Sequence, residues 1–114
     1  MIKACNFTKK DEINSVSATP LQQAKNENLT IAGCAITLSE DEETHEEKKV
    51  GLLSTAEHGM MSTISGTALK SLDIIIDYME DIRKDDPDNF TGIVVKVKVG
   101  KSNAGREFIT LELV

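Results

Sequence analysis

Aromatic residues are scarce in this 114-residue chain: they make up 4% of it, and tryptophan is absent. Hydrophobic residues nevertheless make up 39%, which is an ordinary share for a globular domain. We therefore expect a core of Ile, Val, Leu and Met. The length favours one domain over residues 1–114, which is large enough to fold without disulfide bonds or a structural metal.

Long apolar runs are also missing. The first residues carry no apolar stretch behind their charge, and no segment approaches the roughly 18 consecutive apolar residues of a membrane span. We therefore expect a cytoplasmic protein with no membrane partner. In that compartment Cys5 and Cys34 are expected to be reduced, partly buried thiols, with a disulfide or a shared metal as the less favoured alternative.

Patterns typical of catalysis or cofactor binding are lacking as well. Neither His45 nor His58 has an acid or a nucleophile at a diagnostic spacing. The segment 100–102 resembles the end of a phosphate-binding loop, but Val95 stands where the first glycine of that motif belongs. The acidic segment 85–89 lacks the spacing of a calcium loop. The sequence therefore predicts no enzyme, no cofactor and no metal site.

The net charge of −6 is concentrated in two segments. Residues 40–47 contain six acidic residues and no Lys or Arg, and residues 73–90 contain seven acidic residues against two basic ones. The rest of the chain is slightly basic. An acidic total argues against a broad basic face for duplex DNA, but it leaves room for a local basic strip. The run at 40–47 is typical of a solvated loop.

The hydrophobic pattern predicts a mainly β fold. Residues 9–27 are polar and are expected to form a long loop. Gly33 suits a bulge or a sharp bend in the strand that contains it, and Met60-Met61 either adds a short strand or leads into a helix. Strands are expected at residues 2–8, 29–38, 48–57, 93–99 and 106–113.

One amphipathic helix is expected from about Ser65 to Lys84. Its apolar residues recur at spacings of three and four, and Asp85-Asp86-Pro87 ends it because the residue before proline resists the α conformation. The predicted order is therefore β-β-β-α-β-β. That α+β order is the order of the OB-fold, a five-stranded, partly open barrel whose second and third strands commonly face an oligonucleotide.

The closing hairpin brings cations to an aromatic ring. Alternation along its two strands puts Lys96, Lys98, Arg106 and Phe108 on one outer face, with Lys101 at the tip. Bases of a single strand can stack on such a ring while the cations follow the phosphates. The alternative is a solvated face with the ring packed under a loop. Lys49, on the third strand, either is a further candidate phosphate contact or balances the charge of the neighbouring acidic loop.

Pairing the two apolar faces of the hairpin predicts a register. It sets Val97 beside Ile109 and Lys98 beside Phe108.

Several of these segments together resemble a known family. They are the turn and serine-rich stretch 57–65, the helix 68–78, the Val-Lys-Val strand 95–99, the turn 102–105 and the aromatic strand 108–113. In their order along the chain and in their residue types, they resemble the small single-stranded DNA-binding proteins of phages with protein-primed DNA replication. The resemblance covers roughly residues 50–114 and, more loosely, the strand at 29–38.

This resemblance implies non-sequence-specific binding that coats displaced single strands during phage DNA replication. It implies self-association along the strand, replication proteins as partners, and the cytoplasm of the host cell as the location. Aromatic residues take part in binding in that family, which carries over to Phe108. This chain has Met60-Met61 after the turn where a relative can have an aromatic residue, so no stacking role is carried over there.

A protein-binding module is the alternative function. The chain would then act, for example, as an inhibitor of a host factor, with the acidic loop and the acidic helix face as its contact surface or as a nucleic-acid mimic. RNA binding is a third reading, because no contact to a 2′-hydroxyl can be identified from the sequence.

Overall fold

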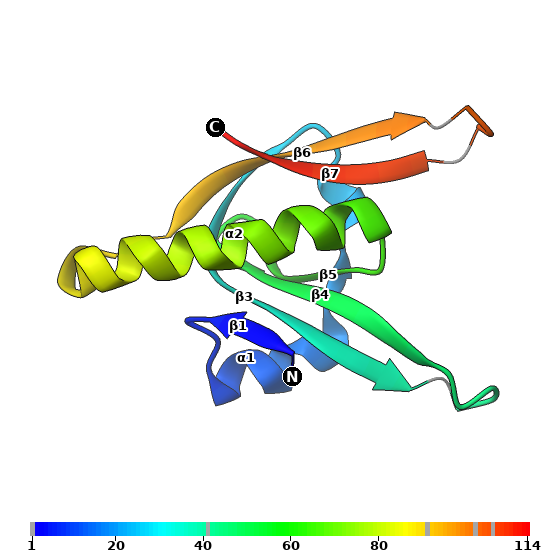
Figure 1. The fold of residues 1–114 in the computed structure, drawn as a ribbon, viewed down its shortest axis with the longest axis horizontal. Helices are drawn as coiled ribbons and strands as arrows, with labels where there is room; N and C mark the ends of the chain where they lie inside the picture. The colour runs from blue at the N-terminus through cyan, green and yellow to red at the C-terminus, as the bar shows by residue number, and fades with distance from the viewer. Residues whose placement is uncertain (1, 41, 91, 102, 106) are drawn as a thin grey trace.

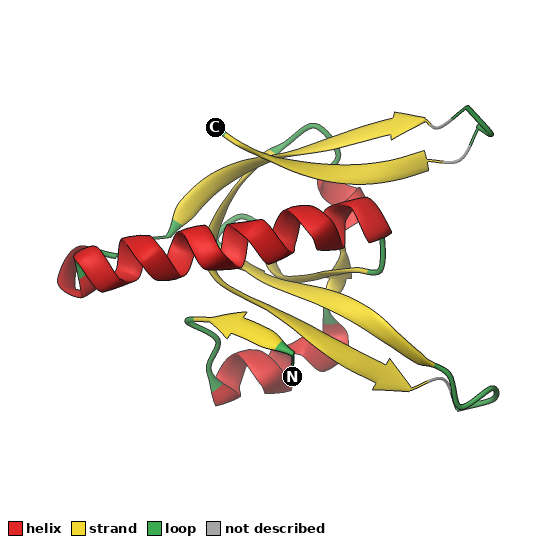
Figure 2. Cartoon of the chain, in the orientation of Figure 1, coloured by secondary structure: helices red, strands yellow, loops and turns green. Residues whose placement is uncertain are grey.

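A curled, mostly antiparallel sheet forms the larger part of the molecule, and a long helix lies across it (Figures 1 and 2). The computed structural model describes residues 2–40, 42–90, 92–101, 103–105 and 107–114 and, of Asn89, the backbone alone. The prediction of a mainly β chain with a helix is confirmed at this level. The elements in chain order are β1 (Lys3–Cys5), α1 (Lys9–Asn14), η1 (Ser15–Ser17), β2 (Thr19–Pro20), η2 (Leu21–Ala24), β3 (Asn28–Glu40), β4 (Glu47–Thr55), β5 (Gly59–Thr63), α2 (Gly66–Asp85), η3 (Pro87–Asn89), β6 (Ile93–Lys101) and β7 (Glu107–Leu113).

Strand β3 organises the sheet, whose order is β2-β5-β4-β3-β6-β7 with β1 also paired to β3. The first residues of β3, Asn28–Ile31, pair with β6, and the remainder pairs with β4. The register shifts between Ile31 and Gly33, so the predicted bulge is confirmed. A Cβ at Gly33 would collide with the backbone oxygen of Asn6, which explains why glycine is needed where β1 ends.

The core lies between this sheet and α2. Leu72, Ile76 and Met79 of α2 are fully buried, so the predicted apolar stripe of the helix is confirmed. They pack against sheet residues that include Leu53 and Met61. Burying side chains of this size contributes about 1.5–3 kcal/mol each. The helix ends at Asp85, just before Asp86 and Pro87, as predicted.

The prediction of a loop over residues 9–27 is wrong, because the structure has α1, η1, β2 and η2 there. Helix α1 buries no residue, so its sequence shows no apolar stripe. It is instead held by a capping box: Asp11 N donates to Thr8 Oγ1 at 3.2 Å, and Thr8 N donates to Asp11 Oδ2 at 2.9 Å. Since α1 begins here, the first strand covers only Lys3–Cys5 instead of residues 2–8.

Among the described residues the sheet has seven strands, whereas five were predicted. The residues around Met60-Met61 form a full strand, β5, paired to β4. Strands β3 and β4 extend further toward the acidic segment than expected, because Glu40 and Glu47 face each other in the ladder. Within the described parts of the chain, no helix combines the length and the apolar character needed to cross a membrane.

Candidate functional site

The β6–β7 hairpin presents one buried face and one outer face. Val95 and Val97 are fully buried, while Lys98 is exposed and Lys96 is half-buried on the opposite side. The strict alternation along a β-strand produces this division. Phe108, on β7, lies on the outer face with the two lysines and is partly exposed.

The predicted register of the hairpin is wrong by two residues. Phe108 faces Gly100 instead of Lys98, and Val97 faces Leu111 instead of Ile109. A shift of two keeps every side chain on its predicted face, so the pattern of alternation alone could not exclude it. In the observed register the Phe108 ring lies over Gly100. A Cβ on Gly100 would lie 2.6 Å from Cζ of Phe108.

One acidic side chain, Glu112, offsets part of the charge of the outer face. Glu112 faces Lys96 in the ladder and forms an ion pair with Lys98, at 2.9 Å between Nζ and Oε2. Both ends of this ion pair are about half exposed, so it contributes at most about 1 kcal/mol and can open when a ligand competes for the lysine.

The remaining predicted cations lie elsewhere. Lys101 faces Glu107 on the inner face of the hairpin, the side of Val99 and Ile109. Arg106 lies outside the described residues. The structure therefore places Lys96, Lys98 and Phe108 on one face of the hairpin, with Phe108 two ladder positions from Lys98 and four from Lys96.

Lys49 is distant from this group along the sheet. It faces Leu38 near the outer end of β3, whereas Lys96 faces Asn28 at the other end. At about 3.3 Å per residue, the intervening stretch of β3 spans roughly 30 Å. Lys49 is exposed and shares a face with Leu53, while the neighbouring Lys48 lies on the opposite face.

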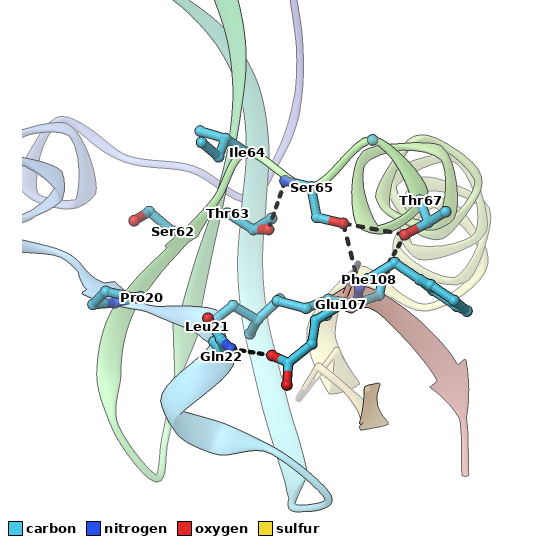
Figure 3. Close-up of a pocket in the computed structure, with 12 residues that line it drawn as sticks. Pro20, Leu21, Gln22, Ser62, Thr63, Ile64, Ser65, Thr67, Glu107 and Phe108 are labelled. Atoms are coloured by element: carbon cyan, nitrogen blue, oxygen red, sulfur yellow. Dashed lines mark hydrogen bonds between the residues drawn. The ribbon is translucent and has the colours of Figure 1, made fainter. Parts of the chain in front are cut away.

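A pocket of about 750 Å³ opens beside the inner face of the hairpin, between β7, β5, the start of α2 and η2 (Figure 3). Its lining comes from residues 20–22, 62–67 and 107–109. The volume lies within the range of roughly 300–1,000 Å³ that is typical of small-molecule sites. Among the described residues that line it, Glu107 is the one charged side chain.

Hydroxyl groups fix the walls of this pocket. Thr67 Oγ1 donates to the Ile109 carbonyl oxygen at 2.6 Å, and Ile109 N donates to Ser65 Oγ at 3.3 Å. These bonds occupy the edge of β7 that faces away from β6. Opposite them, Gln22 Nε2 donates to Glu107 Oε2 at 2.7 Å, and Figure 3 shows the Glu107 side chain reaching toward Gln22.

The pocket could not be predicted directly from the sequence, because its three walls are far apart along the chain. The hydroxyl-rich segment 62–67 leads into α2, and such residues are typical of helix caps. Ser65 does occupy the N-cap position, but its side chain makes no capping hydrogen bond and instead contacts β7. The unusual number of hydroxyls in that segment was the available signal.

The outer face of α2 is the second surface that the sequence indicated. Ile74 and Tyr78 lie one turn apart and are 70% and 45% exposed. Acidic side chains flank them, but Lys3 pairs with two of these, Asp73 at 3.0 Å and Asp77 at 2.8 Å. The two oppositely charged neighbours raise the pKa of Lys3.

The two cysteines are register partners on β1 and β3, and both are free and buried. Burial raises the pKa of the Cys5 thiol to about 11 and that of the Cys34 thiol to about 12. Cys34 Sγ also lies 3.5 Å from Met79 Sδ. Both thiols are therefore protonated and unreactive near neutral pH.

No group of three His, Cys, Asp or Glu side chains comes together as a candidate metal site within the part of the chain that the structure describes. His58 Nε2 lies 3.0 Å from Glu27 Oε1, and His45 Nδ1 lies 3.2 Å from Glu40 Oε1.

Comparison with protein-family models finds none that matches this chain, and comparisons with curated proteins and with solved structures likewise find no match.

Proposed function

We propose that this protein binds single-stranded DNA without sequence specificity and coats displaced strands during phage DNA replication. The observation that carries the proposal is Phe108, a partly exposed aromatic residue on the same outer face of β6–β7 as Lys96 and Lys98. An aromatic platform beside cations suits a flexible strand with accessible bases, since each stacked base contributes about 1–3 kcal/mol. In a duplex the bases are stacked on one another inside the helix, so no base face is available to the Phe108 ring.

The proposal includes an OB-like barrel as the scaffold. The long, bulged strand β3 pairs at one end with β6 and at the other with β4, and α2 is inserted between β5 and β6. We assign β3, β4, β5, β6 and β7 as the five barrel strands. The pocket then lies where β5 and β7 approach without pairing, as expected of a partly open barrel. The assignment differs from the sequence interpretation, in which residues 2–8 were the first strand.

The experiment is a titration of a fluorescently labelled single strand of about 30 nucleotides, followed by anisotropy at low and moderate salt. Binding should weaken as salt rises, because phosphate contacts release counterions. Duplex of the same sequence should compete poorly. Absence of binding at low salt would overturn the proposal.

Phe108→Ala tests the site itself. We expect a loss of affinity of about tenfold, which corresponds to one lost stacking contact. Tyr78→Ala is the matched control, because Tyr78 is also an exposed aromatic residue but lies on α2. Equal affinities for wild type and Phe108→Ala, with both variants folded, would place the site elsewhere, first on the strand face that includes Lys49.

The exposed Ile74 and Tyr78 favour one second candidate, a protein-binding module that uses the acidic face of α2. Apolar side chains surrounded by carboxylates suit a partner with a basic rim and an apolar centre. Under this candidate, free oligonucleotide is not bound. The same titration therefore separates the two functions, and Tyr78→Ala then becomes the informative variant in a pull-down with a host lysate.

A further inference from the structure

The pocket beside the hairpin differs in chemistry from the outer face. Its one charged lining side chain among the described residues is a carboxylate, Glu107, so it repels a phosphate. Its rim includes Ile64, which is 70% exposed, and Pro20. A site with flat apolar edges and a negative acceptor at its wall suits an uncharged ring that carries hydrogen-bond donors.

Glu107 is held in place for such a contact. Gln22 Nε2 donates to its Oε2 at 2.7 Å, which orients the carboxylate and leaves Oε1 without a hydrogen bond to the described residues. The Ser65 and Thr67 hydroxyls already bond to Ile109, and the Thr63 hydroxyl accepts from Ser65 N, so Glu107 supplies the charged acceptor of the wall. Glu107 is therefore the group that selects what enters the pocket.

The pocket and the outer face are adjacent along one strand. Glu107 and Phe108 are consecutive residues of β7, so their side chains leave opposite faces, and in Figure 3 they point away from each other. A single strand that crosses this end of β7 can stack one base on Phe108 and insert a neighbouring base into the pocket. Lys101, which faces Glu107 in the ladder, is placed to hold the intervening phosphate.

From these observations we infer that the pocket binds one nucleobase through an exocyclic amino group donated to Glu107. This inference rests on the proposed function, of which it names the base preference. Cytosine presents an N4 amino donor, whereas thymine presents a carbonyl oxygen at the same position, which the carboxylate repels. Between the two pyrimidines, the protein should therefore prefer cytosine to thymine.

Oligo(dC) and oligo(dT) of equal length, at pH 8 and low salt, provide the test. Both are pyrimidine strands of equal charge, so the phosphate contacts cancel in the comparison. We expect wild type to bind oligo(dC) about tenfold more tightly, the value of one good base-edge contact. Equal affinities for the two strands would overturn the base pocket and leave single-strand binding intact.

Two variants with the same change in charge isolate the pocket. Glu107→Gln keeps an oxygen that can accept from Gln22, and Glu112→Gln removes a carboxylate from the outer face of the same strand. By electrostatics alone, both should bind all single strands more tightly. We expect Glu107→Gln instead to weaken oligo(dC) binding and abolish the preference, while Glu112→Gln keeps it. A parallel gain in both variants would overturn the inference.

Free nucleosides test the pocket independently of strand coating. Deoxycytidine at millimolar concentration should shift the backbone amide resonances of Ile64 and Ile109 in two-dimensional NMR spectra, whereas thymidine should not. If neither oligonucleotide binds, the proposed function fails, and this titration alone decides whether a base enters the pocket. Shifts that are absent, or equal for both nucleosides, would overturn it.

Discussion

The proposed stacking depends on two residues that face each other in the β6–β7 ladder, Phe108 and Gly100. The missing side chain of Gly100 leaves space on the outer face, and the ring of Phe108 occupies it. The atoms nearest to a Cβ on Gly100 belong to the far end of the ring. The ring can therefore turn aside by side-chain rotation, while the backbone ladder stays in place.

Gly100→Ala is expected to weaken single-strand binding roughly fivefold by moving the ring, with a change in stability within about 1 kcal/mol. Anisotropy titration and urea unfolding measure the two effects. The same substitution in a Phe108→Ala background should cause no further loss of affinity, because the ring it displaces is already gone. Additive losses would show that Gly100 acts on binding independently of the ring.

Long elements with a regular apolar pattern were predictable, whereas short elements were missed, even η2, which buries Leu21 and Ala24. Strand β6 alternates Val with Lys because one side is in the core, and α2 repeats its apolar residues because one stripe covers the sheet. Helix α1 buries nothing and is held by Thr8 and Asp11, so its signal was two polar residues in a polar stretch. The register of Phe108 depends on hairpin geometry, which alternation does not determine.

The pairing of β1 with β3 places both cysteines in the core. Both thiols have raised pKa values, about 11 for Cys5 and about 12 for Cys34, because burial disfavours the thiolate. The unfolded chain releases these protons from about pH 9, whereas the folded chain retains them. Their contribution to stability is therefore fully present below about pH 9 and is lost as the pH rises through 11 to 12.

Urea unfolding between pH 7.5 and pH 10.5 should accordingly show a falling free energy of unfolding. The double variant Cys5→Ala, Cys34→Ala is expected to be less stable at neutral pH, because it leaves small cavities, but to show a flatter dependence on pH. Lys3 keeps its acidic partners in the variant, so the difference in slope belongs to the thiols. Parallel slopes for the two proteins would contradict the assignment.

Across the whole molecule, the acidic segment and the proposed binding face belong to different hairpins. The β3–β4 hairpin and the β6–β7 hairpin lie on either side of α2 (Figure 1). The first leads into the acidic segment, in which Glu40 and Glu47 already face each other. The second carries Lys96 and Lys98. With a net charge of −6, such a molecule attracts a polyanion only locally and repels it at longer range.

Neutralising the acidic segment should therefore strengthen binding of single strands without altering the site. We expect the triple variant Glu42→Gln, Glu46→Gln, Glu47→Gln to gain roughly threefold to tenfold in affinity at low salt, with the gain shrinking as salt screens the repulsion.

A second triple variant, Asp81→Asn, Asp85→Asn, Asp88→Asn, changes the net charge equally at the C-terminal end of α2 and just beyond it. If net charge alone governs approach, the two variants gain equally. If the strand also passes the β3–β4 hairpin, where Lys49 lies, the first variant gains more. An unchanged or weaker affinity in the first variant would mean that its carboxylates do not repel the strand, and would turn attention to them as a contact surface for a protein.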